Sequence, residues 1–201
     1  MENEKLNLSN LGVFISKIPD ILLKKLKTEC LDFLKKEKMI SAITADKVPE
    51  HYYLENNNKE LFDFLQLYIK KYDDTYNYSR YYRVLNKNSP LIFGKPWFNI
   101  QKKGEFIPYH KHDGIFSYTI WIQIPNLKDD VKKFKYDSCF EILYQDIIGF
   151  TNNYLIHLDK SYEGKFLFFP SALQHCVYPF FNKDELRISV SGNVFFDNKG
   201  I

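Results

Sequence analysis

Residues 108–125, PYHKHDGIFSYTIWIQIP, and residues 164–193, GKFLFFPSALQHCVYPFFNKDELRISVSGN, decide how this chain folds. Both segments combine short apolar runs, which are typical of strands, with turn residues. Histidines stand at positions 110, 112 and 175, and Arg187 follows the last of them by 12 residues. Side chains at i and i+2 of a strand point to the same face. We therefore expect His110 and His112 to project together.

The three histidines predict a metal site. His175 must come from a separate strand, and its position after Pro170-Ser171 places it at the mouth of the fold. Imidazole suits iron, zinc, copper and nickel alike, so these ligands do not select the metal. A common iron site has two histidines and one carboxylate, and Asp113 is a candidate for that carboxylate. On a regular strand, however, Asp113 points away from His110, so we favour His112 and keep Asp113 as the alternative third ligand.

Arg187 and Ser189 predict a site for a carboxylate. In the segment RISVSGN, polar residues alternate with Ile188 and Val190, so one face of this strand is polar. A guanidinium binds a carboxylate through two parallel hydrogen bonds, and the serine hydroxyl lies beside it. The pair is suited to the distal carboxylate of a small diacid. Burial of these polar groups without partners would be costly.

The length and composition indicate a single domain with a large core. The chain has 201 residues, of which 45% are hydrophobic and 17% aromatic. Aromatic and β-branched residues favour strands, which predicts an antiparallel sandwich. The expected organisation is one domain, 1–201, with a mainly helical support at 1–80 and a jelly-roll core at 81–201.

Helical periodicity is confined to the first part of the chain. Apolar residues recur at helical spacing from Pro19-Asp20 to about Lys36 and again over residues 59–72. The stretch between them, with Pro49 and the turn 56–58, is expected to be irregular. Short strand patterns begin with 11–16 and become frequent after residue 80. The expected strands of the core are 96–102, 106–112, 116–124, 138–144, 153–158, 165–169, 174–180 and 186–196.

Charge and cysteine content exclude several classes of protein. The net charge is +3 and the basic residues are scattered, so there is no strong nucleic-acid signal. No apolar run approaches 18 residues, which argues against a membrane span. The three cysteines form no CxxC motif and their number is odd, which is typical of a reducing compartment. A polar first segment, MENEKLNLSN, shows no signal peptide, so we expect a cytoplasmic protein.

Residues 95–196 resemble the Fe(II)/2-oxoglutarate-dependent dioxygenases, in particular a group with an HxH segment that is common in bacteria and phages. The nucleic-acid demethylase branch carries an Asn and a Gly at the same spacing before its His-x-Asp motif. By that likeness His112 takes the place of the carboxylate ligand, and Asn99 and Gln101 stand where the cosubstrate is contacted. The matching positions are Trp97, Asn99, Gly104, His110, His112, Ser117, Gly164, Phe169, Pro170, Ser171, His175, Val177, Pro179, Arg187, Ser189 and Asn193.

The resemblance implies an α+β protein with a double-stranded β-helix, a cupin-like jelly roll, buttressed by N-terminal helices. It implies an oxidoreductase in which His110, His112 and His175 hold Fe(II) and Arg187 and Ser189 hold 2-oxoglutarate. O2 would be the second cosubstrate, hydroxylation the reaction, and no catalytic residue beyond the metal ligands is expected. The substrate is a small molecule, a protein side chain or a nucleobase, and the oligomeric state stays open.

Two other interpretations fit parts of the sequence. A cupin-like metalloenzyme would use the three histidines without 2-oxoglutarate, but it would have no need of Arg187 and Ser189. A non-enzymatic viral jelly-roll interaction module would need neither the histidines nor the arginine.

Overall fold

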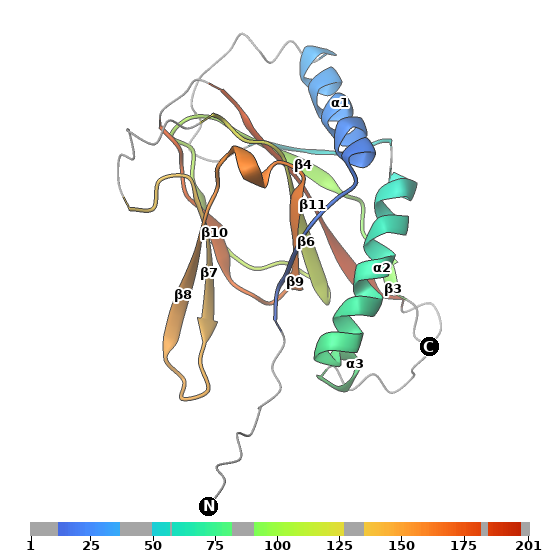
Figure 1. Ribbon diagram of the computed structural model, residues 1–201, viewed down its shortest axis with the longest axis vertical. Helices are drawn as coiled ribbons and strands as arrows, with labels where there is room; N and C mark the ends of the chain where they lie inside the picture. The colour runs from blue at the N-terminus through green and yellow to red at the C-terminus, as the bar shows by residue number, and fades with distance from the viewer. Residues whose placement is uncertain are drawn as a thin grey trace, which may run out of the picture.

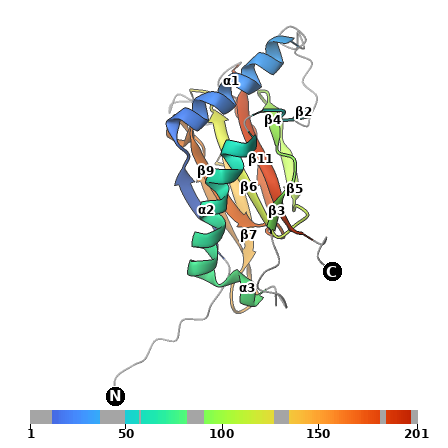
Figure 2. The ribbon, with the colours of Figure 1, turned by 90° about the vertical axis from the view of Figure 1, so that its right-hand side faces the viewer.

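Two antiparallel sheets face each other, and two long helices cover the outer face of the larger sheet (Figures 1 and 2). The computed structural model describes residues 12–36, 50–56, 58–81, 91–126, 135–181 and 185–197. The larger sheet has seven strands and the smaller has four. The fold is a double-stranded β-helix with helices on one side, which confirms the predicted fold class.

The larger sheet takes strands from both ends of the described chain. Its order is β1-β9-β6-β11-β4-β2, and β3 pairs with the far end of β11. Every pairing is antiparallel. The strands are β1 (Phe14–Lys17), β2 (Glu50–Tyr53), β3 (Leu91–Phe93), β4 (Trp97–Gln101), β6 (Phe116–Gln123), β9 (Lys165–Pro170) and β11 (Arg187–Phe196).

The smaller sheet is formed by residues of the second half of the chain. Its order is β5-β10-β7-β8, and its members are β5 (Ile107–His110), β7 (Cys139–Gln145), β8 (Thr151–His157) and β10 (His175–Val177). A 3₁₀ turn at Lys160–Tyr162 connects β8 to β9. The β7–β8 hairpin extends beyond the rest of this sheet (Figure 1).

The helices are amphipathic and bury their apolar faces on the larger sheet. In α1 (Asp20–Lys36) the residues at 22, 26, 30 and 34 are buried, and in α2 (Asn58–Tyr76) those at 61, 65, 69 and 72. These spacings of three and four residues place each set on one helix face. A short α3 (Tyr78–Tyr81) follows α2. In the described part of the chain, no helix has the length and apolarity that a bilayer span requires.

Two apolar clusters lie on opposite sides of the larger sheet, one on each side. The first, which includes Leu26, Leu65 and Phe166, lies between this sheet and the helices. The second, which includes Trp121, Phe140 and Phe169, lies between the two sheets. Strands β4 and β11 separate them, because their alternate residues face opposite sides. Ile188 and Val190 therefore enter the helix-side cluster while their polar neighbours face the second sheet.

Most predicted elements are confirmed, with shifts of a few residues at their ends. The helix at 20–36 is found as predicted, and the helix at 59–72 continues to Tyr76. The expectation of an irregular stretch before the second helix is wrong for residues 50–53, which form β2 against β4. Pro49 and Asn57 lie outside the described residues. Strand β3 and helix α3 were not predicted because each spans only three or four residues.

The side chain of Leu65 should contribute far more to the stability of the fold than that of Leu67. Leu65 is fully buried between α2 and the sheet, whereas Leu67 is 62% exposed on the same helix. We predict that Leu65→Ala lowers the free energy of unfolding by about 2–5 kcal/mol. Leu67→Ala should change it by about 0.5 kcal/mol or less. Denaturant unfolding followed by circular dichroism measures both values, and equal losses would contradict the arrangement.

Candidate metal centre

The three predicted histidines converge between the two sheets. His110 ends β5 and His175 begins β10, and the two residues are direct partners across these strands. One ring nitrogen from each of His110, His112 and His175 lies within 4.8 Å of the others. The ring centroids of His110 and His175 are 4.3 Å apart. His51 and His157, at other places on the strands, do not belong to this cluster.

Backbone hydrogen bonds fix two of the rings in a ligand-ready tautomer. Nδ1 of His110 lies 2.7 Å from the carbonyl oxygen of Pro108, and Nδ1 of His175 lies 3.0 Å from that of Leu173. A carbonyl oxygen only accepts, so both Nδ1 atoms carry the proton and donate it. The Nε2 atom of each ring then keeps a free lone pair, as a metal ligand requires.

Burial keeps the imidazoles of His112 and His175 neutral. Desolvation, and then the neighbouring His110, lower the pKa of His175 to about 3. The same two causes lower the pKa of His112 to about 4, although Asp113 acts in the opposite direction. The ring of Phe140 stacks on His175 at a centroid distance of 5.2 Å, and Phe169 meets it edge-on. Neutral rings in an apolar surrounding can offer their nitrogen lone pairs to a metal at physiological pH.

His112 reaches the cluster from outside the strand. We expected β5 to extend through residue 112, but it ends at His110, so the argument from strand alternation was wrong in its premise. The backbone N–H of His112 instead donates to the carbonyl oxygen of Ser171 at 2.9 Å. Asp113 is exposed and is not part of the nitrogen cluster.

Arg187, the residue expected to hold a carboxylate, is also buried, with 2% of its surface exposed. One terminal nitrogen, Nη1, donates to Oε1 of Gln101 at 2.9 Å and to the carbonyl oxygen of Tyr178 at 3.0 Å. The other, Nη2, donates to Oγ of Ser138 at 2.6 Å. Its Nε is buried and has no hydrogen-bond partner among the described residues. The guanidinium has five N–H donors and three of them make these bonds, so two donors, one of them at Nε, remain for another group.

Gln101 holds the arginine. The Gln101 amide nitrogen donates to the carbonyl oxygen of Glu105 at 2.6 Å, which turns its Oε1 toward Arg187. The contact of Gln101 with the cosubstrate stays a prediction, and in this structure its amide makes these two bonds. Asn99 is less constrained, since its side-chain nitrogen lies 3.5 Å from Oγ of Ser189.

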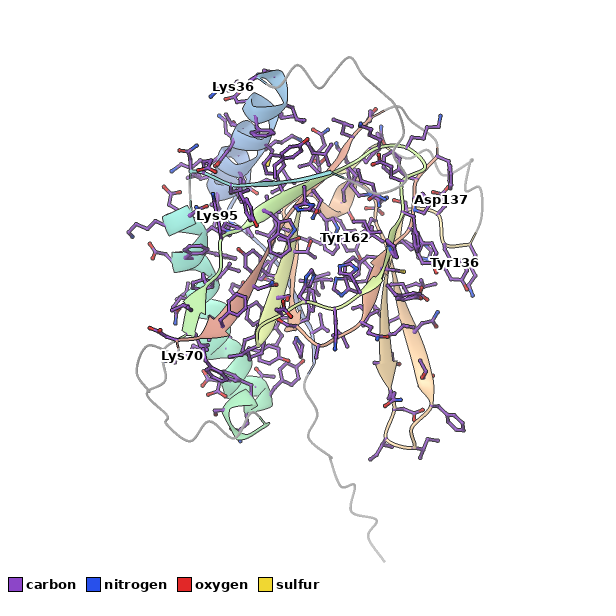
Figure 3. The ribbon with its side chains drawn as sticks, turned by 180° about the vertical axis from the view of Figure 1, so that it is seen from behind. Lys36, Lys70, Lys95, Tyr136, Asp137 and Tyr162 are labelled. Carbon is purple, nitrogen blue, oxygen red and sulfur yellow. The ribbon has the colours of Figure 1, made fainter. Side chains whose placement is uncertain are left out.

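Ser138 was missed by sequence reasoning. Its backbone φ of 60° is in the left-handed region, which is uncommon outside glycine. Ser138 also donates through Oγ to the carbonyl oxygen of Leu158 at 2.8 Å. Tyr136 and Asp137, labelled in Figure 3, lie on the segment that leads through Ser138 into β7. A lone serine in a turn carries no sequence signal for such a contact.

Arg187 stays protonated although it is buried. Desolvation lowers its pKa to about 9, and the negative charge of Asp137 limits the effect. At neutral pH the side chain is therefore a cation in an apolar surrounding, with the ring of Phe180 at 4.9 Å. A buried cation is stabilised by an anion that it can bind directly.

A cavity of about 80 Å³ connects the histidines to Arg187. Its wall includes all the residues expected at the cosubstrate site, namely Asn99, Gln101, Arg187 and Ser189, and does not include Asp113. Pockets for drug-sized molecules measure about 300–1,000 Å³, so this one suits a small ligand. Three imidazoles and a guanidinium with a free donor in the wall of one cavity fit a metal and a small dicarboxylate.

Comparison with known proteins agrees with this chemistry. Residues 95–193 match a family model described as "Putative 2OG-Fe(II) oxygenase". Residues 95–193 therefore form an oxygenase region of this family. The protein is an oxidoreductase that uses Fe(II) and 2-oxoglutarate, which favours the predicted activity over the cupin-like enzyme and the interaction module. Among curated proteins, none matches the chain.

Solved structures of similar fold include prolyl hydroxylases. A prolyl-4-hydroxylase from Pseudomonas putida has a TM-score of 0.56 and 11% identity, with 93% of this chain and 94% of that chain covered. The viral collagen prolyl hydroxylase of Paramecium Bursaria Chlorella virus-1, in a 2OG complex, has a TM-score of 0.53, 11% identity, and coverages of 92% and 96%. HygX from Streptomyces hygroscopicus, with nickel and 2-oxoglutarate bound, has a TM-score of 0.53, 7% identity, and coverages of 94% and 84%.

A buried carboxylate braces the strands of the oxygenase that carry His110 and His175. Glu141, 2% exposed, accepts hydrogen bonds from the hydroxyls of Tyr109 and Tyr178 and from the side-chain amide of Asn153. Tyr109 directly precedes His110, and Tyr178 follows β10. Burial raises the pKa of Glu141, but the hydrogen bonds outweigh burial and lower the pKa below its ordinary value. Glu141 therefore stays ionised and ties three strands together.

The ionised Glu141 should make stability depend on pH in the acid range. A carboxyl with a lowered folded-state pKa stabilises the fold above its unfolded pKa of about 4.3, and this contribution is lost as the pH falls through the folded value. We predict that Glu141→Gln is less stable than wild type by about 1–3 kcal/mol at pH 7. The difference should shrink below about pH 4.

Urea unfolding at several pH values measures this difference. Glu60→Gln is the matched control, because Glu60 is a half-exposed carboxylate paired with Lys25 on the surface. Glu60→Gln should change the free energy of unfolding by no more than about 1 kcal/mol. A Glu141→Gln variant as stable as wild type at pH 7 would contradict the bracing role.

Proposed function

We propose that this oxygenase hydroxylates its substrate at an Fe(II) held by His110, His112 and His175, with the distal carboxylate of 2-oxoglutarate on Arg187. The observation that carries the proposal is one cavity whose wall holds the three imidazoles and a buried guanidinium, the Nε of which has no partner among the described residues. The prolyl hydroxylases among the structures of similar fold support hydroxylation as the outcome.

The chain's own residues bind and orient the reactants. Arg187 would grip the distal carboxylate through Nε, while Gln101 and Ser138 hold the guanidinium plane in place. Ser189, on the same strand face, would add a hydroxyl donor. The carbonyls of Pro108 and Leu173 keep two imidazoles turned inward. When bound, Fe(II), 2-oxoglutarate and O2 supply the oxidising chemistry.

A neutral third ligand changes the electrostatics of the site. Three imidazoles leave the full charge of a divalent ion, whereas a carboxylate ligand would cancel part of it. Together with the buried Arg187, this places two positive centres at the ends of one small cavity. We infer that the site selects a dianion, because a charge left unpaired in an apolar surrounding is costly.

We also propose that the chain forms one domain, 1–201, in a reducing, cytoplasmic compartment. Strands β1 and β2, which precede residue 80, are integral to the larger sheet, which supports a single folding unit. The three cysteines are buried and form no disulfide with one another, which supports a compartment that keeps thiols reduced.

Each proposed ligand should be needed for metal binding. We predict that His110→Ala, His112→Ala and His175→Ala each weaken Fe(II) binding by more than about 100-fold, a loss above that expected for residues which only support a ligand. Asp113→Ala is the control and should bind nearly as tightly as wild type. Anaerobic Fe(II) titration gives the affinities and circular dichroism checks the fold. A larger loss for Asp113→Ala than for His112→Ala would make Asp113 the third ligand.

Arg187 should govern cosubstrate affinity without affecting the metal. We predict that Arg187→Ala weakens 2-oxoglutarate binding by about 3–5 kcal/mol, or roughly two to four decades. Arg187→Lys should recover part of this, since an ammonium lacks the planar fork. Ser189→Ala should cost about 1–3 kcal/mol.

Calorimetric titration of the Mn(II)-substituted protein with 2-oxoglutarate compares these variants, and a parallel Mn(II) titration confirms that each still holds the metal. Equal 2-oxoglutarate affinity in Arg187→Ala and wild type would move the carboxylate site elsewhere.

A further inference from the structure

Three polar side chains form a buried chain of hydrogen bonds that the oxygenase chemistry does not use. Ser117 on β6 and Ser171 after β9 are 1% and 0% exposed, and their Oγ atoms are 2.8 Å apart. Ser117 Oγ also lies 2.8 Å from Oδ1 of Asn193 on β11. The three residues are far apart in the sequence, and none of them lines the cavity.

The direction in which these hydrogen bonds are donated follows from Asn193. The carbonyl oxygen Oδ1 of Asn193 only accepts, so the single hydroxyl proton of Ser117 is donated to it. Ser117 Oγ then accepts the hydroxyl proton of Ser171. Each buried hydroxyl is thus satisfied, and loss of one member leaves the next without its partner.

The backbone of Ser171 also hydrogen-bonds to the segment that carries His112. Its carbonyl oxygen accepts the N–H of His112 at 2.9 Å, and its own N–H donates to the carbonyl oxygen of Ile115 at 3.0 Å. Between these bonds lies Gly114, whose φ of 94° favours glycine and at which a Cβ would lie 2.6 Å from the carbonyl oxygen of Val194. Residues 112–115 therefore have a fixed path over Ser171.

His112 needs this support more than the other two histidines. The rings of His110 and His175 are each held by a backbone carbonyl two residues away. Among the described residues, none makes a hydrogen bond to the ring of His112, whose ring neighbours are His110 at a centroid distance of 4.9 Å, His175 at 5.1 Å and Trp97 at 5.6 Å. Its position depends on the backbone at residue 112, and that backbone is bonded to Ser171.

We propose that Ser117, Ser171 and Asn193 are positioning residues that set the place of His112 in the metal centre. The inference rests on the proposed role of His112 as a ligand. Side chains that support metal ligands without touching the metal typically contribute 10- to 100-fold in affinity. The network would explain how a histidine beyond the end of a strand acts with two histidines on strands.

The test compares variants that differ only in the hydrogen bond. Asn193→Leu removes the acceptor at nearly constant size, whereas Asn193→Asp keeps it. Ser171→Ala removes the donor at the other end. Ser16→Ala is the control, because it removes a serine hydroxyl that contacts Tyr68 at 2.9 Å on the distant strand β1. Affinity for Co(II) alone and the visible spectrum of the Co(II) protein report on the metal centre, and hydrogen exchange reports on the His112 amide.

We expect Asn193→Leu and Ser171→Ala to weaken Co(II) binding by about 10–100-fold, to shift the Co(II) spectrum and to speed exchange of the His112 amide. Asn193→Asp and Ser16→Ala should resemble wild type. If the two disrupting variants lose stability but bind Co(II) with unchanged affinity and spectrum, the network is only structural and the inference is wrong. If wild type itself binds no Co(II), the proposed metal site fails and the inference fails with it. If one of the two disrupting variants does not fold, the other one decides the test.

Discussion

The pairing of β5 with β10 is the constraint on which the rest of the site depends. It sets His110 directly opposite His175 in the space between the two sheets. Strand β10 also pairs with β7, which brings Phe140 against the His175 ring and Glu141 to the outer side of the same sheet. One short strand of three residues therefore joins the two imidazoles, their apolar cover and the carboxylate that braces them.

A second constraint is the burial of a cation on the central strand of the larger sheet. The side chain of Arg187 projects from a face of β11 into the cavity wall, where 2% of its surface is exposed, so it depends on Gln101, Ser138 and the Tyr178 carbonyl. In the described part of the chain, Nε of Arg187 has no hydrogen-bond partner. An arginine held in this way stays a cation and keeps donors free to bind an anion. It is therefore suited to a site that takes an acidic cosubstrate.

Local pattern was sufficient to predict most strands, the two long helices and the residues that line the cavity together. Period-two alternation in β11 separates Arg187 and Ser189 from Ile188 and Val190, and the same rule applies to β4. The features that could not be predicted from the sequence depend on long-range contacts. Strand β2 has only four residues and forms because β4 offers an edge, while Ser138 meets Arg187 across 49 positions of sequence. The place of His112 follows from Ser171, which no spacing rule connects to it.

The central claim is that one cavity binds Fe(II) and 2-oxoglutarate together. The most direct test is an anaerobic titration of the full chain with Fe(II) and then 2-oxoglutarate, recorded by visible absorption. We predict a charge-transfer band that appears only with both ligands present and saturates at one equivalent of each. Glutarate, which has both carboxylates but no keto oxygen, should not produce it. Absence of the band at saturating Fe(II) and 2-oxoglutarate would contradict the account.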